Sequence, residues 1–227
     1  MAILALEFSS PRRSVAVAAA GGVLGEVIET GAGFQPGNLF RPAGATGAFR
    51  MIEAVLREAK LAREQIEILA IGLGPGSYTG VRAALALAQG WRLARETKLL
   101  GVSSIEAIAA QAQSEKIFGR AEVVIDAQRD EFYLARYEIT ANGWGVVEPL
   151  KILTLAEVKL RAGVDGVLVG PEVTRWFPDG RTIFPSAATL ARLVVKGEGL
   201  VSGEKLEPIY LRETNFVKTV PRKSDAG

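Results

Sequence analysis

The 227-residue sequence predicts an α/β protein of two lobes, each built on a mixed sheet flanked by helices. Three observations lead to this class. Short apolar runs at hairpin spacing open the chain, helical apolar patterns then alternate with single strand-like runs, and a reduced version of this order recurs in the second half. The predicted division places residues 1–103 in the first lobe and 104–227 in the second, from which the tail could return to the first.

The first half alternates strands and helices in a recognisable order. Gly21 and Gly22 supply a tight turn, because glycine tolerates the positive φ that hairpins need. Phe49, Ile52 and Val55 recur at helical intervals, which predicts an amphipathic helix. The predicted strands are 3–8, 14–20, 23–29, 66–73 and 98–102, and the predicted helices are 46–61, 79–95 and 104–113.

The second half is shorter and follows a similar order. It predicts strands at 121–126, 131–139 and 166–170 and a helix at 187–196, without a visible sequence repeat. The first half reads β-β-β-α-β-α-β, which is the order of a half-domain in actin-like ATPases and sugar kinases. The sequence therefore predicts the actin-like ATPase fold (ASKHA, ribonuclease H-like).

The composition excludes several classes of site. The chain has no cysteine and no histidine, which removes disulfides, thiolate metal sites, Ser-His-Asp triads and histidine zinc sites. Lys and Arg number 27 against 25 Asp and Glu without a clustered excess, so a dedicated nucleic-acid binder is not expected. Because the start lacks a basic stretch and no apolar run approaches the roughly 18 residues of a membrane span, a cytoplasmic protein without membrane contact is expected.

The glycine-rich turn at 72–80 is the most informative segment. A strand that ends in glycines and leads into a helix presents free N–H groups, which suits an anion, but the same glycines also permit close helix–strand packing. The turn lacks the lysine of the Walker motif, since Val81 and Arg82 follow Gly80, and both interpretations stay open. The candidate nucleotide contacts are Ser9, Ser10, Gly74, Gly76 and Ser77.

Two carboxylates end corresponding predicted strands. Glu7 and Asp126 are placed where actin-like kinases organise magnesium and nucleotide phosphates, so a small ATPase or phosphotransferase using both with Mg²⁺ is the rival function. The other interpretation, which we favour, is that each caps a turn or pairs with a nearby cation. No nucleophile stands beside an evident activating base, so no catalytic residue and no metal ligand set is predicted.

Five blocks in order then carry a resemblance to a known family. The chain reads Ile-Leu-Ala-Leu-Glu-Phe-Ser-Ser at 3–10, Gly-Pro-Gly-Ser-Tyr-Thr-Gly-Val-Arg at 74–82, Gly-Val-Ser-Ser-Ile-Glu-Ala at 101–107, Ile-Asp-Ala-Gln-Arg-Asp-Glu-Phe-Tyr at 125–133 and Glu-Pro-Ile-Tyr-Leu-Arg at 207–212. Together they resemble the bacterial TsaB (YeaZ) family. The second block matches the family's Gly-Pro-Gly-Ser-Phe-Thr-Gly-Leu-Arg almost letter for letter.

The resemblance implies a supporting role in tRNA modification. It implies an actin-like fold that has lost catalysis and acts as a scaffold or activating subunit in threonylcarbamoyladenosine synthesis at position 37 of tRNA. The expected partners are TsaD, in a heterodimer, and TsaE, with a homodimer when TsaD is absent and with tRNA reached only through the complex. No cofactor of its own is expected, while ATP and magnesium are possible at the level of the complex.

The resemblance also places the docking surface on helices of the first lobe. Carried over by position, the expected partner contacts are Phe49, Ile52, Glu53, Val55, Leu56 and Arg82. The chain departs from the family pattern at Glu7 for Asp, Phe8 for Thr and Asp130 for Gly, and residues 31–44 lack the common His-Ser or His-Thr pair. These departures weaken the case that the chain itself holds a nucleotide.

Overall fold

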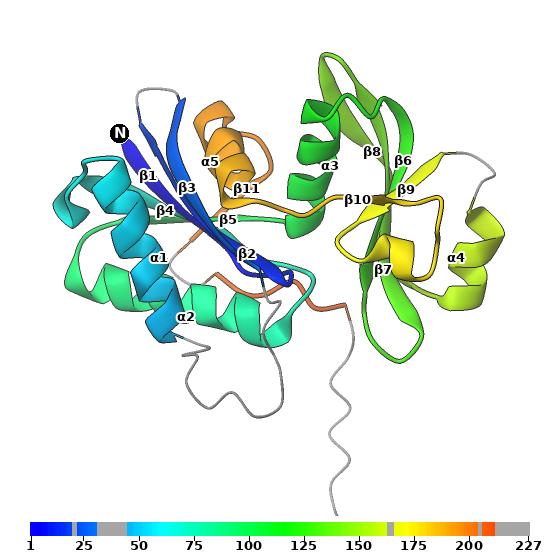
Figure 1. Cartoon of the computed structure of the whole chain (residues 1–227), viewed down its shortest axis with the longest axis horizontal. Helices are drawn as coiled ribbons and strands as arrows, with labels where there is room; N and C mark the ends of the chain where they lie inside the picture. The colour runs from blue at the N-terminus through cyan, green and yellow to red at the C-terminus, as the bar shows by residue number, and fades with distance from the viewer. Residues whose placement is uncertain (20–21, 31–44, 163–165, 204–205, 212–227) are drawn as a thin grey trace, which may run out of the picture.

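The protein consists of two lobes that lie side by side, each with a mixed sheet and flanking helices (Figure 1). The computed structural model describes residues 1–19, 22–30, 45–162, 166–203 and 206–211. The predicted fold class is confirmed. The sequence analysis also concerned the loop at 31–44 and the end of the tail. Both lie outside the described residues.

The first sheet has six strands in the order β11-β5-β4-β1-β2-β3. β1 pairs antiparallel with β2 and β2 with β3, while β1, β4 and β5 run parallel and β11 pairs antiparallel with β5. The carboxyl ends of the three parallel strands therefore meet at one edge, where open α/β proteins commonly bind ligands. The strands are β1 Ala2–Glu7, β2 Arg12–Ala19, β3 Gly22–Thr30, β4 Ile66–Gly72, β5 Lys98–Val102 and β11 Leu200–Ser202.

Helices cover both faces of this sheet. α1 (Ala45–Glu58) and α2 (Tyr78–Ala94) lie on one face, and α5 (Ala187–Lys196) lies on the other (Figure 1). Successive side chains of β1 point to opposite faces of the sheet and so contribute to two hydrophobic cores. Leu4 and Leu6 face α1 and α2, while Ile3 and Ala5 face α5. This is the alternation that a sheet buried on both faces requires.

The second sheet has the order β10-β9-β6-β7-β8, with β6, β7 and β8 antiparallel and β9 and β10 parallel to β6. Its strands are β6 Gly119–Asp126, β7 Glu131–Thr140, β8 Gly143–Thr154, β9 Val167–Gly170 and β10 Arg181–Thr182. α3 (Ser104–Ser114) packs on one face, and α4 (Leu155–Arg161) lies against β7 and β8. Two 3₁₀ turns, Arg63–Gln65 and Val173–Arg175, complete the elements.

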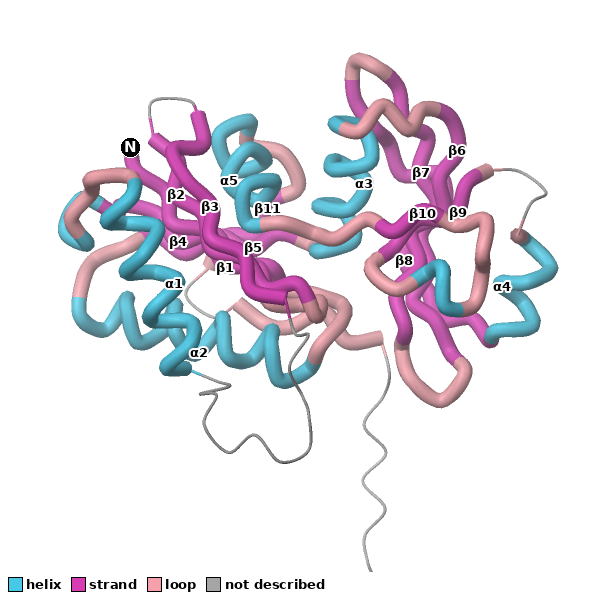
Figure 2. The backbone as a smooth tube through the Cα atoms, viewed as in Figure 1, coloured by secondary structure: helices cyan, strands magenta, loops and turns pink. Residues whose placement is uncertain are grey.

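The α5 helix belongs to the first lobe, although the sequence division placed residues 187–196 in the second (Figure 2). Its first backbone N–H groups explain the position. Ala187 N donates to Ser14 Oγ (2.7 Å) and Ala188 N donates to Glu26 Oε1 (3.0 Å). The first N–H groups of a helix have no acceptor within the helix, and here side chains of β2 and β3 accept from them. The sequence pattern does not reveal this long-range pairing.

All predicted strands and helices are present, but β8, α4, β10 and β11 were not predicted. In β8, two glycines and Pro149 obscure the alternation that marks a strand. The pairing with β7 shifts register between Leu134 and Arg136, opposite Pro149. β8 is also an edge strand, where proline at a bulge is tolerated.

The segment 206–211 returns across the first lobe. Ile209 N donates to Leu73 O at 2.9 Å, Leu206 is buried, and Ile209 packs against the core beneath α1 and α2. The strap 206–211, as we call it, therefore lies at the carboxyl edge of β4. Among the described residues, none of the helices has the length and apolar character needed to cross a bilayer.

Candidate functional site

The glycine-rich turn holds the start of α2 against the turn between β1 and β2. Ser77 is the N-cap of α2, and its Oγ accepts from Gly80 N at 3.2 Å. Ser77 N in turn donates to Ser9 O at 2.7 Å. Gly74 and Gly76 have φ of +82° and +147°, a backbone region that favours glycine.

Two glycines of the turn are required by close backbone contact. A Cβ on Gly76 would lie 2.2 Å from the carbonyl oxygen of Ser9, and one on Gly80 would lie 1.9 Å from that of Phe8. No side chain fits at either distance. Of the two interpretations that the sequence left open, close packing therefore accounts for both positions.

Glu7 lies directly beneath this contact and is completely buried. Its Oε1 accepts from Ser9 N at 2.7 Å, and its Oε2 accepts from Ser104 Oγ at 2.9 Å. Ser104 Oγ also accepts from Gly74 N at 3.1 Å, so the carboxyl group joins β1, the glycine-rich turn and the first turn of α3. A Cβ on Gly72 would lie 2.0 Å from Oε2, so only glycine leaves room for the carboxyl group.

Burial raises the pKa of Glu7 above its ordinary value of 4.5, and the bonds from Ser9 and Ser104 oppose that shift. Asp126 is held differently, by Gln128 N at 2.7 Å and Gln128 Nε2 at 2.9 Å within its own turn. Each carboxylate thus caps a local turn, as the favoured interpretation has it. Among the described residues, no group of three or more acidic, His or Cys side chains is arranged to hold a metal ion.

The predicted nucleotide contacts are brought together, but most of their donors are already used. Gly74 N and Ser77 N donate within the protein, and Ser10 Oγ donates to Arg12 O at 3.1 Å. Ser9 is the exception, because its buried Oγ has no partner in the described part of the chain. Gly76, as described above, fits against the Ser9 backbone.

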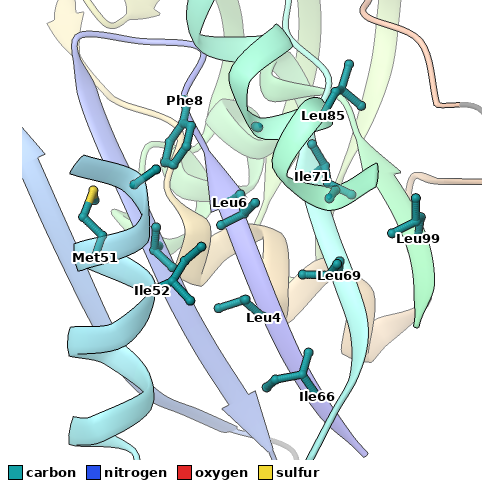
Figure 3. Close-up of a cluster of buried hydrophobic side chains, with 14 of the residues drawn as sticks. Leu4, Leu6, Phe8, Met51, Ile52, Ile66, Leu69, Ile71, Leu85 and Leu99 are labelled. Atoms are coloured by element: carbon teal, nitrogen blue, oxygen red, sulfur yellow. The ribbon is translucent and has the colours of Figure 1, made fainter. Parts of the chain in front are cut away.

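A second feature is an apolar groove of about 500 Å³ between α1 and α2, floored by β1 and β4. Leu4, Leu6, Leu69 and Ile52 point toward the space between the two helices (Figure 3). Phe49, 50% exposed, stands at its rim. The full lining is Leu4, Leu6, Phe49, Ile52, Leu69, Ala83, Ala86, Leu87, Gly90 and Trp91.

Trp91 stands in the α2 wall of this groove. Its indole Nε1 is buried and finds no acceptor among the described residues. The surface of the groove is almost wholly apolar, so it suits apolar side chains.

The predicted partner contacts lie in different surroundings. Phe49 and Ile52 line the groove, and Glu53 is exposed beside it, paired with Arg63 Nη2 at 2.8 Å. Val55 and Leu56 are buried against the first sheet, and Ile52 is equally buried at 2% exposed. Helical periodicity identifies an apolar face without showing how much of it the protein's own core covers.

Arg82 does not line the groove; its guanidinium stacks over the Tyr78 ring, with Cζ 5.0 Å from the ring centroid. The resemblance in the sequence placed the helix after Gly80 on the docking surface but named only Arg82 from it. The residues that form the α2 wall of the groove are Ala83, Ala86, Leu87, Gly90 and Trp91. A signal for them was available. α2 is rich in Ala and Leu around its circumference, more than one buried face requires.

The fold defines the class of protein: an actin-like α/β protein of two lobes, in which the strap lies at the carboxyl edge of β4. The family described as TsaD, tRNA N6-adenosine threonylcarbamoyltransferase, matches residues 31–209.

Comparison with individual proteins shows which members of this wider family the chain resembles. The Escherichia coli K12 protein named tRNA threonylcarbamoyladenosine biosynthesis protein TsaB is 30% identical over 190 residues, which cover 76% of this chain and 82% of that protein. The solved structure named YeaZ from Pseudomonas aeruginosa aligns with a TM-score of 0.73 and 27% identity, covering 92% of this chain and 99% of that chain. The chain belongs to the TsaB (YeaZ) family, which confirms the resemblance in the sequence.

Replacing Gly80 by alanine tests the backbone contact. Gly80→Ala forces a methyl group against Phe8 O, so we expect the free energy of unfolding to fall by about 1–3 kcal/mol. Gly90→Ala is the matched control in the same helix, because a Cβ there meets no atom within 4 Å. It should raise stability by up to about 1 kcal/mol. Urea denaturation measures both, and equal effects would contradict the contact.

Replacing Glu7 by glutamine tests its buried carboxyl group. Because the folded pKa is raised, the native state holds the proton more tightly, and stability falls as pH rises from 4.5 toward the folded pKa. The free energy of unfolding of the wild type, minus that of Glu7→Gln at the same pH, should therefore decrease across that window. Denaturation at a series of pH values measures it. A difference that stays constant, or grows with pH, counts against this environment for Glu7.

Proposed function

We propose that this chain is a non-catalytic scaffold subunit of the machinery that makes threonylcarbamoyladenosine in tRNA, and that it docks TsaD through the groove between α1 and α2. The observation that carries the proposal is the groove itself. It is apolar and lies on the predicted docking helices of a chain that belongs to the TsaB family.

The composition of the groove supports a helical protein partner. Its walls are two helices and its floor is a sheet, a shape that accepts the apolar face of another helix. Phe49 at the rim is a half-exposed aromatic side chain that a partner can bury. A second copy of the chain could cover the same groove when TsaD is absent, which is how we account for the expected homodimer.

The state of the carboxylates supports a role without chemistry of its own. Glu7 and Asp126 both accept hydrogen bonds from their own surroundings, and the sequence offers no histidine or cysteine. We therefore assign the transfer step to TsaD, and ATP and magnesium to the complex that includes TsaE. On this proposal, the chain contributes a binding surface to the complex.

A charged residue at the groove rim should prevent docking. Phe49→Asp places a carboxylate where apolar side chains must be buried, and we expect the affinity for purified TsaD to fall about thirtyfold or more. Because Phe49 is half-exposed, the variant should fold normally. Calorimetry and size-exclusion chromatography measure the heterodimer.

Leu160→Asp is the matched control. Leu160 is 80% exposed on α4 in the other lobe, so the same type of change there should leave TsaD binding intact. A folded Phe49→Asp variant that binds TsaD as tightly as the wild type rejects the groove as the docking site. Equal loss in both variants rejects it too.

A further inference from the structure

Two tyrosines and an arginine form an exposed cluster outside the groove, at the start of α2. The rings of Tyr78 and Tyr210 have centroids 5.4 Å apart and planes inclined at 32°. Arg82 stacks over the Tyr78 ring and donates to its hydroxyl group. Tyr78 is 56% and Tyr210 41% exposed, so much of both rings faces solvent. We name these three residues the tyrosine platform.

The platform is held in place from both sides. Tyr78 belongs to the first turn of α2, which the Ser77 cap and the Ser9 contact fix. Tyr210 belongs to the strap, anchored by the bond from Ile209 N to Leu73 O. The first turn of α2 and the strap therefore bring together two aromatic side chains from distant parts of the sequence. Neither ring is buried in a core.

The chemistry of the platform differs from that of the groove. It offers π-faces, phenol groups and a guanidinium, whereas the groove is lined by apolar side chains. Aromatic rings that stack on bases, combined with a cation for the phosphate, are the usual means of binding single-stranded nucleic acid.

Charge at the platform points the same way. Arg82 adds a cation on the described surface. Phosphate is the complement of this charge, and an acidic backbone carrying flat bases is the partner that matches both features.

We propose that the tyrosine platform is an RNA contact, in which an unpaired nucleobase stacks on Tyr210 or Tyr78 and an adjoining phosphate binds Arg82. The balanced charge of the whole chain sets a modest affinity, so the contact adds to those of the complex and does not replace them. It goes beyond the expectation that tRNA is reached only through other subunits. It does not depend on the docking groove.

Fluorescence anisotropy with the full chain and a labelled tRNA anticodon stem–loop tests the proposal at low salt. Tyr78→Ala and Tyr210→Ala should each weaken binding about 5- to 150-fold, while Tyr210→Phe, which keeps the ring, should bind like the wild type. Arg82→Gln should reduce the slope of log affinity against log salt by about one. A blunt duplex of the same length should compete poorly, because its bases are stacked.

Matched controls separate the platform from general surface effects. Phe118→Ala removes another half-exposed aromatic ring, and Arg175→Gln removes another arginine that stacks on an aromatic ring, over Trp176 at 4.9 Å. Neither should change RNA binding. The proposal is overturned if the wild type shows no saturable RNA binding, or if the alanine variants bind RNA as the wild type does. It is overturned too if they lose TsaD with RNA binding unchanged, which would make the cluster a protein contact.

Discussion

One backbone contact governs the first lobe. The carbonyl oxygens of Phe8 and Ser9 occupy the space where side chains of Gly80 and Gly76 would otherwise lie. This contact fixes where α2 begins, and the position of α2 relative to α1 leaves the groove open. Glu7 beneath it ties the same turn to α3 of the second lobe. These contacts lie at the sheet edge that open α/β proteins commonly use for ligands.

The sequence predicted the elements well and their surroundings less well. Hydrophobic periodicity identified α1, but it could not show that Val55 and Leu56 are covered by the first sheet while Phe49 is not. The glycine-rich turn suggested anion binding and packing equally, because the distance from Gly80 to Phe8 is a long-range property. Pro149 concealed β8, and the bonds from α5 to β2 and β3 decided its lobe. The local sequence pattern predicts helices and strands. Contacts between distant residues decide which of their faces are covered and which lobe they join.

α2 joins the two surfaces that the structure presents. Its first turn supplies Tyr78 and Arg82 to the tyrosine platform, and its later turns supply Leu87 and Trp91 to the groove. One helix, set by one glycine-rich turn, therefore orients a polar surface and an apolar one. In this chain the family block at 74–82 therefore positions a helix.

On our proposal, this chain contributes its α1–α2 surface to a complex. Hydrogen–deuterium exchange of the full chain with and without TsaD measures this, since amides covered by a partner exchange more slowly. We expect added protection in α1 and α2, with β6, β7 and α4 unchanged. Protection confined to the second lobe, or none under conditions in which the two proteins bind, would contradict it.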